Sequence, residues 1–206
     1  FVDRGLANIK KNLEKQVAKG RMTEEAKEAA LANLSGTTEL ADAKDADFVI
    51  EAASENVEIK KNIFQQLDGI CKPAAILASN TSSIPITEIA SATKRPEQVI
   101  GTHFFNPVPA MKLLEIVVGY LTSDETYEIA RSLGADQMGK VTIKAQDKGG
   151  FIVNRLIDPF INEAVYLVEE GVGTVEDIDK GVKNGLNHPM GPLELADLIG
   201  LDVMLA

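Results

Sequence analysis

The sequence predicts an α/β fold in which a mostly parallel sheet, covered by helices, is followed by an all-helical segment. Two observations support this prediction. Short apolar runs of strand type alternate with stretches of helical period up to residue 148, whereas only helical patterns follow residue 150. The pattern changes at Lys148-Gly149-Gly150, so we expect one domain over residues 1–148 and a second over residues 149–206.

Two helices are expected at the start of the chain. Apolar residues recur along one face of residues 5–20, and Thr23 followed by two glutamates is typical of the N-cap and first turn of a second helix. Basic residues dominate residues 4–21, where Glu14 is the only acidic residue. The basic residues are Arg4, Lys10, Lys11, Lys15, Lys19 and Arg21. A polyanionic ligand is therefore a candidate partner, and the alternative is a solvated helix face.

Strands and helices alternate in the next part of the chain. We expect strands at residues 47–52, 75–78, 99–105, 113–118 and 140–144, and helices at residues 57–71, 86–92 and 123–133. Such alternation indicates a mostly parallel sheet with helices on both faces. Ligands of these sheets bind outside the carboxyl ends of the strands, where the loop after Ile50, the polar loop 79–83 and His103 fall.

Helical patterns make up the remainder. They cover residues 151–170, 174–184 and the stretch from Pro192 onward, and Pro159 should kink the first or leave one carbonyl unpaired. The apolar face of such a bundle favours a homodimer, although an ordinary core has the same pattern. The chain begins with Phe1 rather than Met, and its last helical pattern has no stop signal before Ala206, which indicates a fragment.

Composition excludes several classes of protein. The 206 residues are 45% hydrophobic and 25% charged, which is typical of a soluble globular protein. A formal net charge of −10 argues against general nucleic-acid or membrane-surface binding. The single cysteine, Cys71, excludes an internal disulfide framework and a multi-cysteine metal site, and it suits a reducing compartment. With no apolar run of membrane-spanning length and no signal peptide, a cytoplasmic location is expected.

A histidine and a glutamate are the strongest candidates for chemistry. His103 lies in a predicted buried strand, and Glu115 lies between Leu114 and Ile116 in the next one. A buried carboxylate needs a cation or a donor, and a histidine within about 4 to 6 Å would serve and would hold one imidazole tautomer. The alternative is a core histidine bonded to backbone and an edge-strand carboxylate. A third possibility is a serine hydrolase with Ser82 or Ser83 as nucleophile, but neither lies in a G-x-S-x-G motif.

Four sequence blocks carry a resemblance to a known family. They are residues 78–83, ASNTSS; residues 101–115, GTHFFNPVPAMKLLE; residues 150–155, GFIVNR; and residues 188–192, HPMGP. In this order and spacing they resemble the NAD-dependent 3-hydroxyacyl-CoA dehydrogenases, in particular the bacterial 3-hydroxybutyryl-CoA dehydrogenases. The resemblance implies a Rossmann-type sheet that is incomplete at its amino terminus, and reversible oxidation of an (S)-3-hydroxyacyl-CoA to the 3-ketoacyl-CoA with hydride transfer to NAD, in fatty-acid or butanoate metabolism.

The resemblance also implies roles for individual residues. His103 would be the catalytic base, Glu115 its orienting partner, Ser82 a hydrogen-bonding group for substrate and cofactor, and Asn154 the amide that polarises the substrate oxygen. The remaining implied contacts are with the cofactor, through Ala52, Glu55, Lys60, Ser82 and Asn106, and with coenzyme A, through Asn12, Lys19 and Ser82. No metal is implied, and the active site would lie in the cleft between the domains.

Two of these residues also have other interpretations, and the sequence departs from the family's pattern at two points. Ser82 and Asn154 are also suited to cap helices. The family's G-x-G-x-x-G turn is not in this sequence, and Gly149 stands where the family commonly has proline. The runner-up function is a non-catalytic acyl-CoA-binding or structural relative of the same fold.

Overall fold

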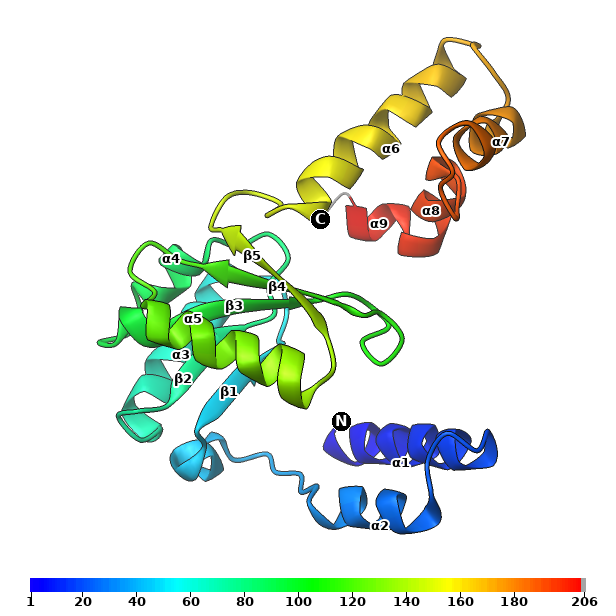
Figure 1. Ribbon diagram of the computed structural model, residues 1–206. Helices are drawn as coiled ribbons and strands as arrows, with labels where there is room; N and C mark the ends of the chain where they lie inside the picture. The colour runs from blue at the N-terminus through cyan, green and yellow to red at the C-terminus, as the bar shows by residue number, and fades with distance from the viewer. Residues whose placement is uncertain (205–206) are drawn as a thin grey trace.

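The computed structural model describes residues 1–204, and a five-stranded sheet in the order β1-β2-β3-β4-β5 forms its centre (Figure 1). The strands are β1 Phe48–Glu51, β2 Ile76–Ser79, β3 Val99–Phe104, β4 Leu113–Val118 and β5 Val141–Gln146. Neighbouring strands run parallel except β3 and β4, which pair antiparallel because the connection over residues 105–112 is too short for a parallel crossover. The predicted mostly parallel sheet is confirmed.

Helices cover both faces of the sheet. The bounds are α3 Val57–Ile70, α4 Ile86–Ala90 and α5 Asp124–Ser132, with the short 3₁₀ helices η1 Leu40–Asp45 and η2 Pro96–Gln98 and the π-helical segment η3 Leu133–Gln137. Alternate strand residues point to opposite faces. Leu77 and Val99 pack with α3 and α4, whereas Ile100 and Ile116 pack with Ala130 of α5. His103 falls in the same alternation as Val99, so its side chain lies on the face that α3 and α4 cover.

One hydroxyl in this core has no partner among the described residues. Thr102 of β3 is 3% exposed, and its Oγ1 makes no hydrogen bond there. Because a buried hydroxyl without a partner costs about 1–3 kcal/mol, we expect Thr102→Val to raise the free energy of unfolding by about 1 kcal/mol, measured by urea unfolding.

A second buried threonine provides the control for this prediction. Thr126 is 2% exposed, and its hydroxyl donates to the Glu97 carbonyl at 2.8 Å. Thr126→Val should therefore destabilise the protein, because it removes one of the two hydrogen bonds to that carbonyl, which also accepts from the Ser123 N–H at 3.0 Å. A loss of stability in Thr102→Val as large as in Thr126→Val would contradict the prediction.

The first two helices form a hairpin that precedes the sheet. They are α1 Val2–Ala18 and α2 Glu24–Ala32, and they pack on each other (Figure 1). Thr23 is the N-cap of α2, where its Oγ1 accepts a hydrogen bond from the Ala26 N–H at 3.2 Å, as its sequence position predicts. Residues 33–39 connect the hairpin to the rest of the chain.

The carboxyl-terminal helices follow β5. Their bounds are α6 Val153–Glu169, α7 Val175–Gly185, α8 Pro192–Ile199 and α9 Leu201–Met204. The prediction of a helix from residue 151 is wrong by two residues, because Gly150 and Phe151 have φ values of 69° and 46° and form a left-handed turn. The single helix expected from Pro192 onward is also wrong. Gly200, with φ of 98°, separates α8 from α9.

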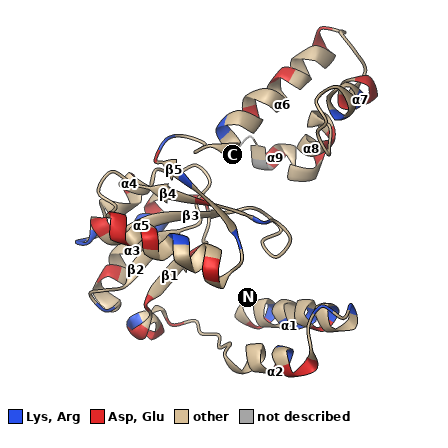
Figure 2. Cartoon of the chain, viewed as in Figure 1, with Lys and Arg blue, Asp and Glu red and all other residues tan. Residues whose placement is uncertain are grey.

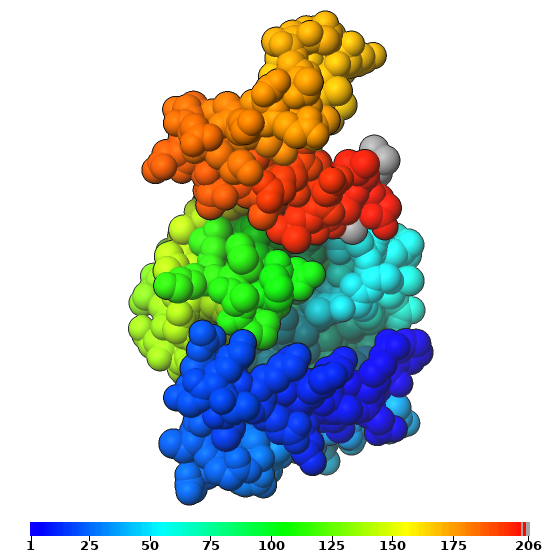
Figure 3. Space-filling model, turned by 90° about the vertical axis from the view of Figure 1, so that its right-hand side faces the viewer, coloured from blue at the N-terminus to red at the C-terminus, as the bar shows by residue number. Residues whose placement is uncertain are grey.

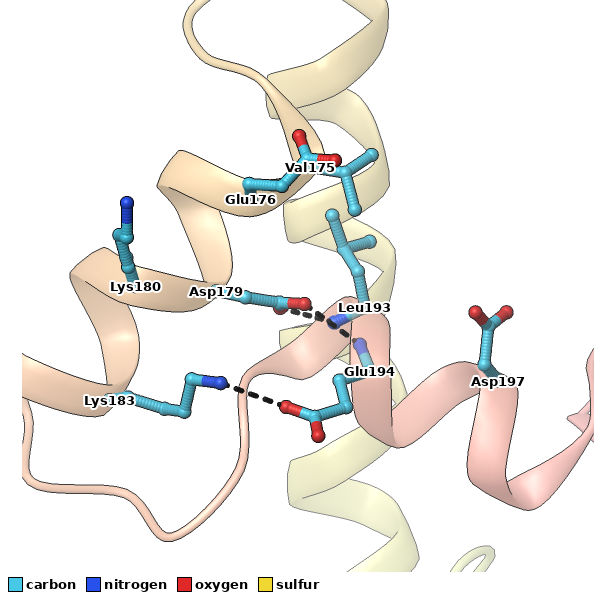
Figure 4. Close-up of a pocket in the computed structure, with 8 residues that line it drawn as sticks. All are labelled: Val175, Glu176, Asp179, Lys180, Lys183, Leu193, Glu194 and Asp197. Carbon is cyan, nitrogen blue, oxygen red and sulfur yellow. Dashed lines mark hydrogen bonds and ion pairs between the residues drawn. The ribbon is translucent and has the colours of Figure 1, made fainter.

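A buried carboxylate joins α7 to α8 (Figure 4). Asp179 accepts hydrogen bonds from the backbone N–H groups of Leu193 and Glu194 at 2.9 and 3.0 Å, so it satisfies free donors at the start of α8. A Cβ atom at Gly191 would lie 2.2 Å from the Asp179 carboxylate, which explains the glycine. None of the described helices combines the length and the hydropathy that a membrane crossing requires.

Candidate active site

His103 and Glu115 face each other across the antiparallel pair of strands β3 and β4. Their Cα atoms are partners in the register, and His103 Nδ1 lies 2.7 Å from Glu115 Oε2. Glu115 is completely buried and His103 nearly so. A carboxylate only accepts hydrogen bonds, so Nδ1 must carry a proton, and in the neutral ring Nε2 then has a free lone pair. The predicted contact is confirmed, and the geometry leaves Nε2 able to accept a proton.

Both parts of the competing interpretation of this pair are wrong. The His103 ring bonds to a carboxylate rather than to the backbone. Glu115 is not on an edge strand either, because β4 lies between β3 and β5. Sequence alternation could not decide the strand order, which depends on long-range pairing.

The second oxygen of Glu115 contacts the carboxyl-terminal helices. Oε1 accepts hydrogen bonds from the N–H groups of Ile152 and Val153 at 3.2 and 3.1 Å, at the beginning of α6. Free N–H groups and the helix dipole favour negative charge there. One buried carboxylate therefore orients the His103 ring and anchors the start of α6.

The turn before α6 also supplies part of the wall around His103. The Phe151 ring centroid lies 5.6 Å from that of His103, and Phe105 lies 4.6 Å away on the same imidazole. Asn154 follows in the first turn of α6, where it is half-buried. The helix-cap alternative for Asn154 is wrong, because the N-cap is Ile152. The Glu115 contacts thus bring the turn that carries Asn154 close to the His103 strand.

Glu55 organises the polar loop that carries Ser82. Its Oε1 accepts from the N–H groups of Ser82 and Ser83 at 3.0 and 3.2 Å and from the Thr81 hydroxyl. Partial burial opposes ionisation, but the Thr81 hydroxyl, these two N–H groups and the nearby Lys60 ammonium together lower the pKa of Glu55 from 4.5 to about 2. Glu55 is therefore ionised at neutral pH.

The structure also answers the two alternatives for Ser82. The helix-cap interpretation is wrong, because the N-cap of α4 is Pro85. A hydrolase would require Ser82 to bond to His103, yet the Ser82 hydroxyl is directed to Glu55 at 3.4 Å while His103 bonds to Glu115. Since β2 and β3 are neighbours in the sheet, the Ser82 loop and His103 lie at the ends of adjacent strands.

The other residues of the implied cofactor site differ in their exposure. Ala52 and Asn106 are exposed after the ends of β1 and β3, and Glu55 has 37% of its side chain exposed. Lys60 is different, because its side chain is only 1% exposed and its ammonium pairs with Glu51 at 2.9 Å and with Glu55 at 3.3 Å. Lys60 therefore lies on the protein-interior side of Glu55.

Two contacts that the sequence analysis did not identify fasten the loop after His103. Asn80 Oδ1 accepts from the Phe104 N–H at 2.9 Å, and Lys140 Nζ donates to the carbonyl of Met111 at 2.7 Å. The position of Asn80 directly after a buried strand was a usable signal for the first. The Lys140 contact spans 29 residues and leaves no local pattern.

The residues implied for coenzyme A lie elsewhere. Asn12 and Lys19 are both exposed, on α1 and at its C-cap. Figure 2 shows basic residues recurring along this helix. The hydrogen bonds around His103 do not include α1, so the structure does not join Asn12 or Lys19 to that site.

A hollow of about 420 Å³ lies between α7 and α8, away from these residues (Figure 4). Two of its charged groups, Lys183 and Glu194, pair with each other at 3.0 Å, and Asp179 is bonded to backbone N–H groups of α8. Among the residues that the structure describes, no group of three or more histidine, cysteine or acidic side chains could hold a metal ion. The His103 strand therefore remains the candidate centre of chemistry.

Comparisons with known proteins agree with this geometry. Residues 1–148 match the family described as 3-hydroxyacyl-CoA dehydrogenase, NAD binding domain, and residues 150–206 match the 3-hydroxyacyl-CoA dehydrogenase C-terminal domain. The 3-hydroxybutyryl-CoA dehydrogenase of Clostridioides difficile is 51% identical over 205 residues, which are 100% of this chain and 73% of that protein.

Solved structures show the same relationship. The (S)-3-hydroxybutyryl-CoA dehydrogenase of Ralstonia eutropha has a TM-score of 0.96 and 48% identity, covering 99% of this chain and 72% of the other. FadB2 of Mycobacterium tuberculosis has a TM-score of 0.94 and 45% identity, covering 98% and 72%. The chain therefore belongs to the NAD-dependent 3-hydroxyacyl-CoA dehydrogenases, a family of oxidoreductases.

Proposed function

We propose that the protein interconverts (S)-3-hydroxybutyryl-CoA and acetoacetyl-CoA, with NAD as the hydride carrier, in fatty-acid or butanoate metabolism. The observation that carries this proposal is the buried bond between His103 Nδ1 and Glu115 Oε2 at 2.7 Å. The named activities of the C. difficile and R. eutropha relatives support the choice of substrate.

His103 acts as the base for the substrate hydroxyl. Its Nε2 accepts the hydroxyl proton while the carbon gives up hydride, and a positioned base of this kind contributes about a hundred to ten-thousandfold. Glu115 holds the ring in one tautomer and compensates the charge that the ring gains. Asn154 and Ser82 donate hydrogen bonds to the substrate oxygen, which stabilises negative charge on it.

The chemistry of the residues at the strand ends fits the nicotinamide half of NAD. The ionised, partly exposed Glu55, the Ser82 hydroxyl and the exposed Asn106 amide can bind ribose hydroxyls and a carboxamide. Ala52 lines this site and Lys60 supports it from behind Glu55. When bound, NAD supplies the hydride acceptor.

The remaining proposals concern the two helical parts of the chain. We place the domain division at residues 1–148 and 149–206, supported by the limits of the two family matches.

Figure 3 shows the green segment near residue 110 between the carboxyl-terminal helices and the amino-terminal hairpin. Asn12 and Lys19 on that hairpin are proposed to bind coenzyme A, whose phosphate groups favour basic partners.

Exposed apolar side chains on α6 support a homodimer. Leu156 is 70% exposed, and Val165 and Tyr166 are also exposed. Large exposed apolar patches mark interaction sites. We propose pairing through the helices of residues 149–206, in a cytoplasmic protein, and sedimentation equilibrium giving twice the chain mass would support the pairing.

The test of the proposed function is NADH oxidation by acetoacetyl-CoA, followed at 340 nm in the native full-length protein. We expect turnover that depends on both substrates, because His103 and Glu115 are in place to transfer the proton. Binding of acetoacetyl-CoA without any NADH oxidation would instead support the non-catalytic relative. Omission of acetoacetyl-CoA is the control for background oxidation.

A further inference from the structure

Glu51, the last residue of β1, has a buried carboxylate to which the proposed reaction assigns no role. Its Oε1 accepts from Lys60 Nζ at 2.9 Å and from the Ala53 N–H at 2.5 Å, and its Oε2 accepts from the Ser79 hydroxyl at 2.7 Å. The side chain is 3% exposed. A buried carboxylate with this many donors is fixed in position, because each hydrogen bond restricts rotation of the carboxylate group.

Two separate routes lead from Glu51 to the loop that carries Ser82. The first runs through Lys60, whose ammonium lies between Glu51 and Glu55, to the Glu55 carboxylate that accepts from Ser82 N–H. The second runs through Ser79, whose Oγ accepts from the Thr81 N–H at 3.2 Å. Both routes end in the same short loop, so the position of Glu51 affects the conformation of that loop through two separate sets of contacts.

The burial of Lys60 makes the first route depend on Glu51. The Lys60 side chain is 1% exposed, and Glu51 is the nearer of the two carboxylates to its ammonium. An ammonium without that carboxylate would be a buried charge with a single, half-exposed partner, which is unfavourable. Lys60 would then have to move, and Glu55 would lose the contact that holds its Oε2.

We propose that Glu51 is a positioning residue for the cofactor site: it fixes Lys60 and Ser79 so that Glu55 and Ser82 hold the geometry that NAD requires. This inference rests on the proposed function, which places the cofactor at Glu55 and Ser82. A purely structural role is the alternative, in which Glu51 stabilises β1 and α3 without affecting cofactor affinity.

The test is Glu51→Gln in the native full-length protein, with NADH affinity measured by fluorescence titration and the kinetic constants for NADH and acetoacetyl-CoA measured separately. We expect the Kd and KM for NADH to rise about tenfold, because Glu55 and Ser82 would be displaced from the positions in which they bind NADH. The KM for acetoacetyl-CoA should stay within twofold. Glu51→Asp, which keeps the charge, should restore part of the NADH affinity.

A matched ion pair on the same helix gives the control. Lys61 of α3 pairs with Glu88 at 2.9 Å, the distance of the Lys60–Glu51 pair, but both side chains are partly exposed. Glu88→Gln should leave every constant within twofold, since exposed pairs contribute little. Unfolding midpoints of all variants separate lost stability from lost affinity.

A second variant keeps the test decisive if Glu51→Gln does not fold. Ser79→Ala removes the route to Thr81 and leaves the ion pair, and we expect it to raise the Kd for NADH about threefold. Unchanged NADH affinity in the variants that fold would overturn the inference and leave Glu51 structural. If the unsubstituted protein turns over while these variants match it, only this inference fails; if it binds no NADH, the proposed function fails.

Discussion

Replacing His103 with glutamine is expected to lower kcat for acetoacetyl-CoA reduction by about a hundred to ten-thousandfold. In the direction of reduction, protonated His103 gives its proton to the oxygen that develops from the ketone. An amide at this position cannot deliver a proton, although it fills similar space and can still bond to Glu115. The KM for acetoacetyl-CoA should change little, because proton transfer matters in the transition state rather than in binding.

The other histidine of the chain is the control for this prediction. The sequence has two histidines, and His188 is exposed near Phe160, with ring centroids 5.5 Å apart. His188→Gln should retain full kcat. A His103→Gln variant that folds, binds NADH and keeps kcat within twofold would remove His103 from the mechanism.

Replacing Glu115 with glutamine is expected to reduce kcat by about a hundred to ten-thousandfold through the tautomer of His103. The Gln amide can turn its oxygen to the N–H groups of Ile152 and Val153, as Glu115 Oε1 does. Its NH₂ group then faces His103 Nδ1 and requires that nitrogen to accept. The ring proton moves to Nε2, which can no longer take the substrate proton in oxidation and could give up its proton in reduction only by forming an imidazolate.

The same substitution tests the anchoring of α6. A neutral amide bonds more weakly than a carboxylate to the two N–H groups, so the free energy of unfolding should fall by about 1–3 kcal/mol, measured by urea unfolding. The double variant His103→Gln, Glu115→Gln should be little slower than either single variant, since residues that act as a unit are not additive. Multiplied losses in the double variant would contradict a shared role.

Much of the fold could be predicted from local sequence. Apolar runs located all five strands to within a few residues, and Leu113–Val118 agrees with its predicted bounds. Thr23 and Ser123 marked helix starts because their hydroxyls accept from N–H groups three residues later. The helix boundaries at residue 151 and at Gly200 were wrong, because positive φ values there follow from packing and turn geometry that a helical period does not record.

The contacts of the candidate site could likewise be predicted only in part. The pair of His103 and Glu115 was predictable, because an acid inside an apolar strand must find a donor and the preceding strand of the chain offers one. The network of Glu51, Lys60 and Glu55 was not, since Lys60 in the sequence is one lysine of a helix like its neighbour Lys61. Only burial separates the two, at 1% and 27% side-chain exposure.

The sequence by itself determined the strands and helices, the contact between His103 and Glu115, and the family. These depend on periodicity, on short loops and on blocks of residues close together in the chain. Tertiary structure alone decided that Glu115 also holds α6, that Asn80 and Lys140 fasten the loop after His103, and that Glu51 reaches the Ser82 loop by two routes. Apart from the exposed Lys140 bond, these contacts satisfy buried or partly buried polar groups with partners that the local pattern does not indicate, and folding selects those partners by excluding water from them.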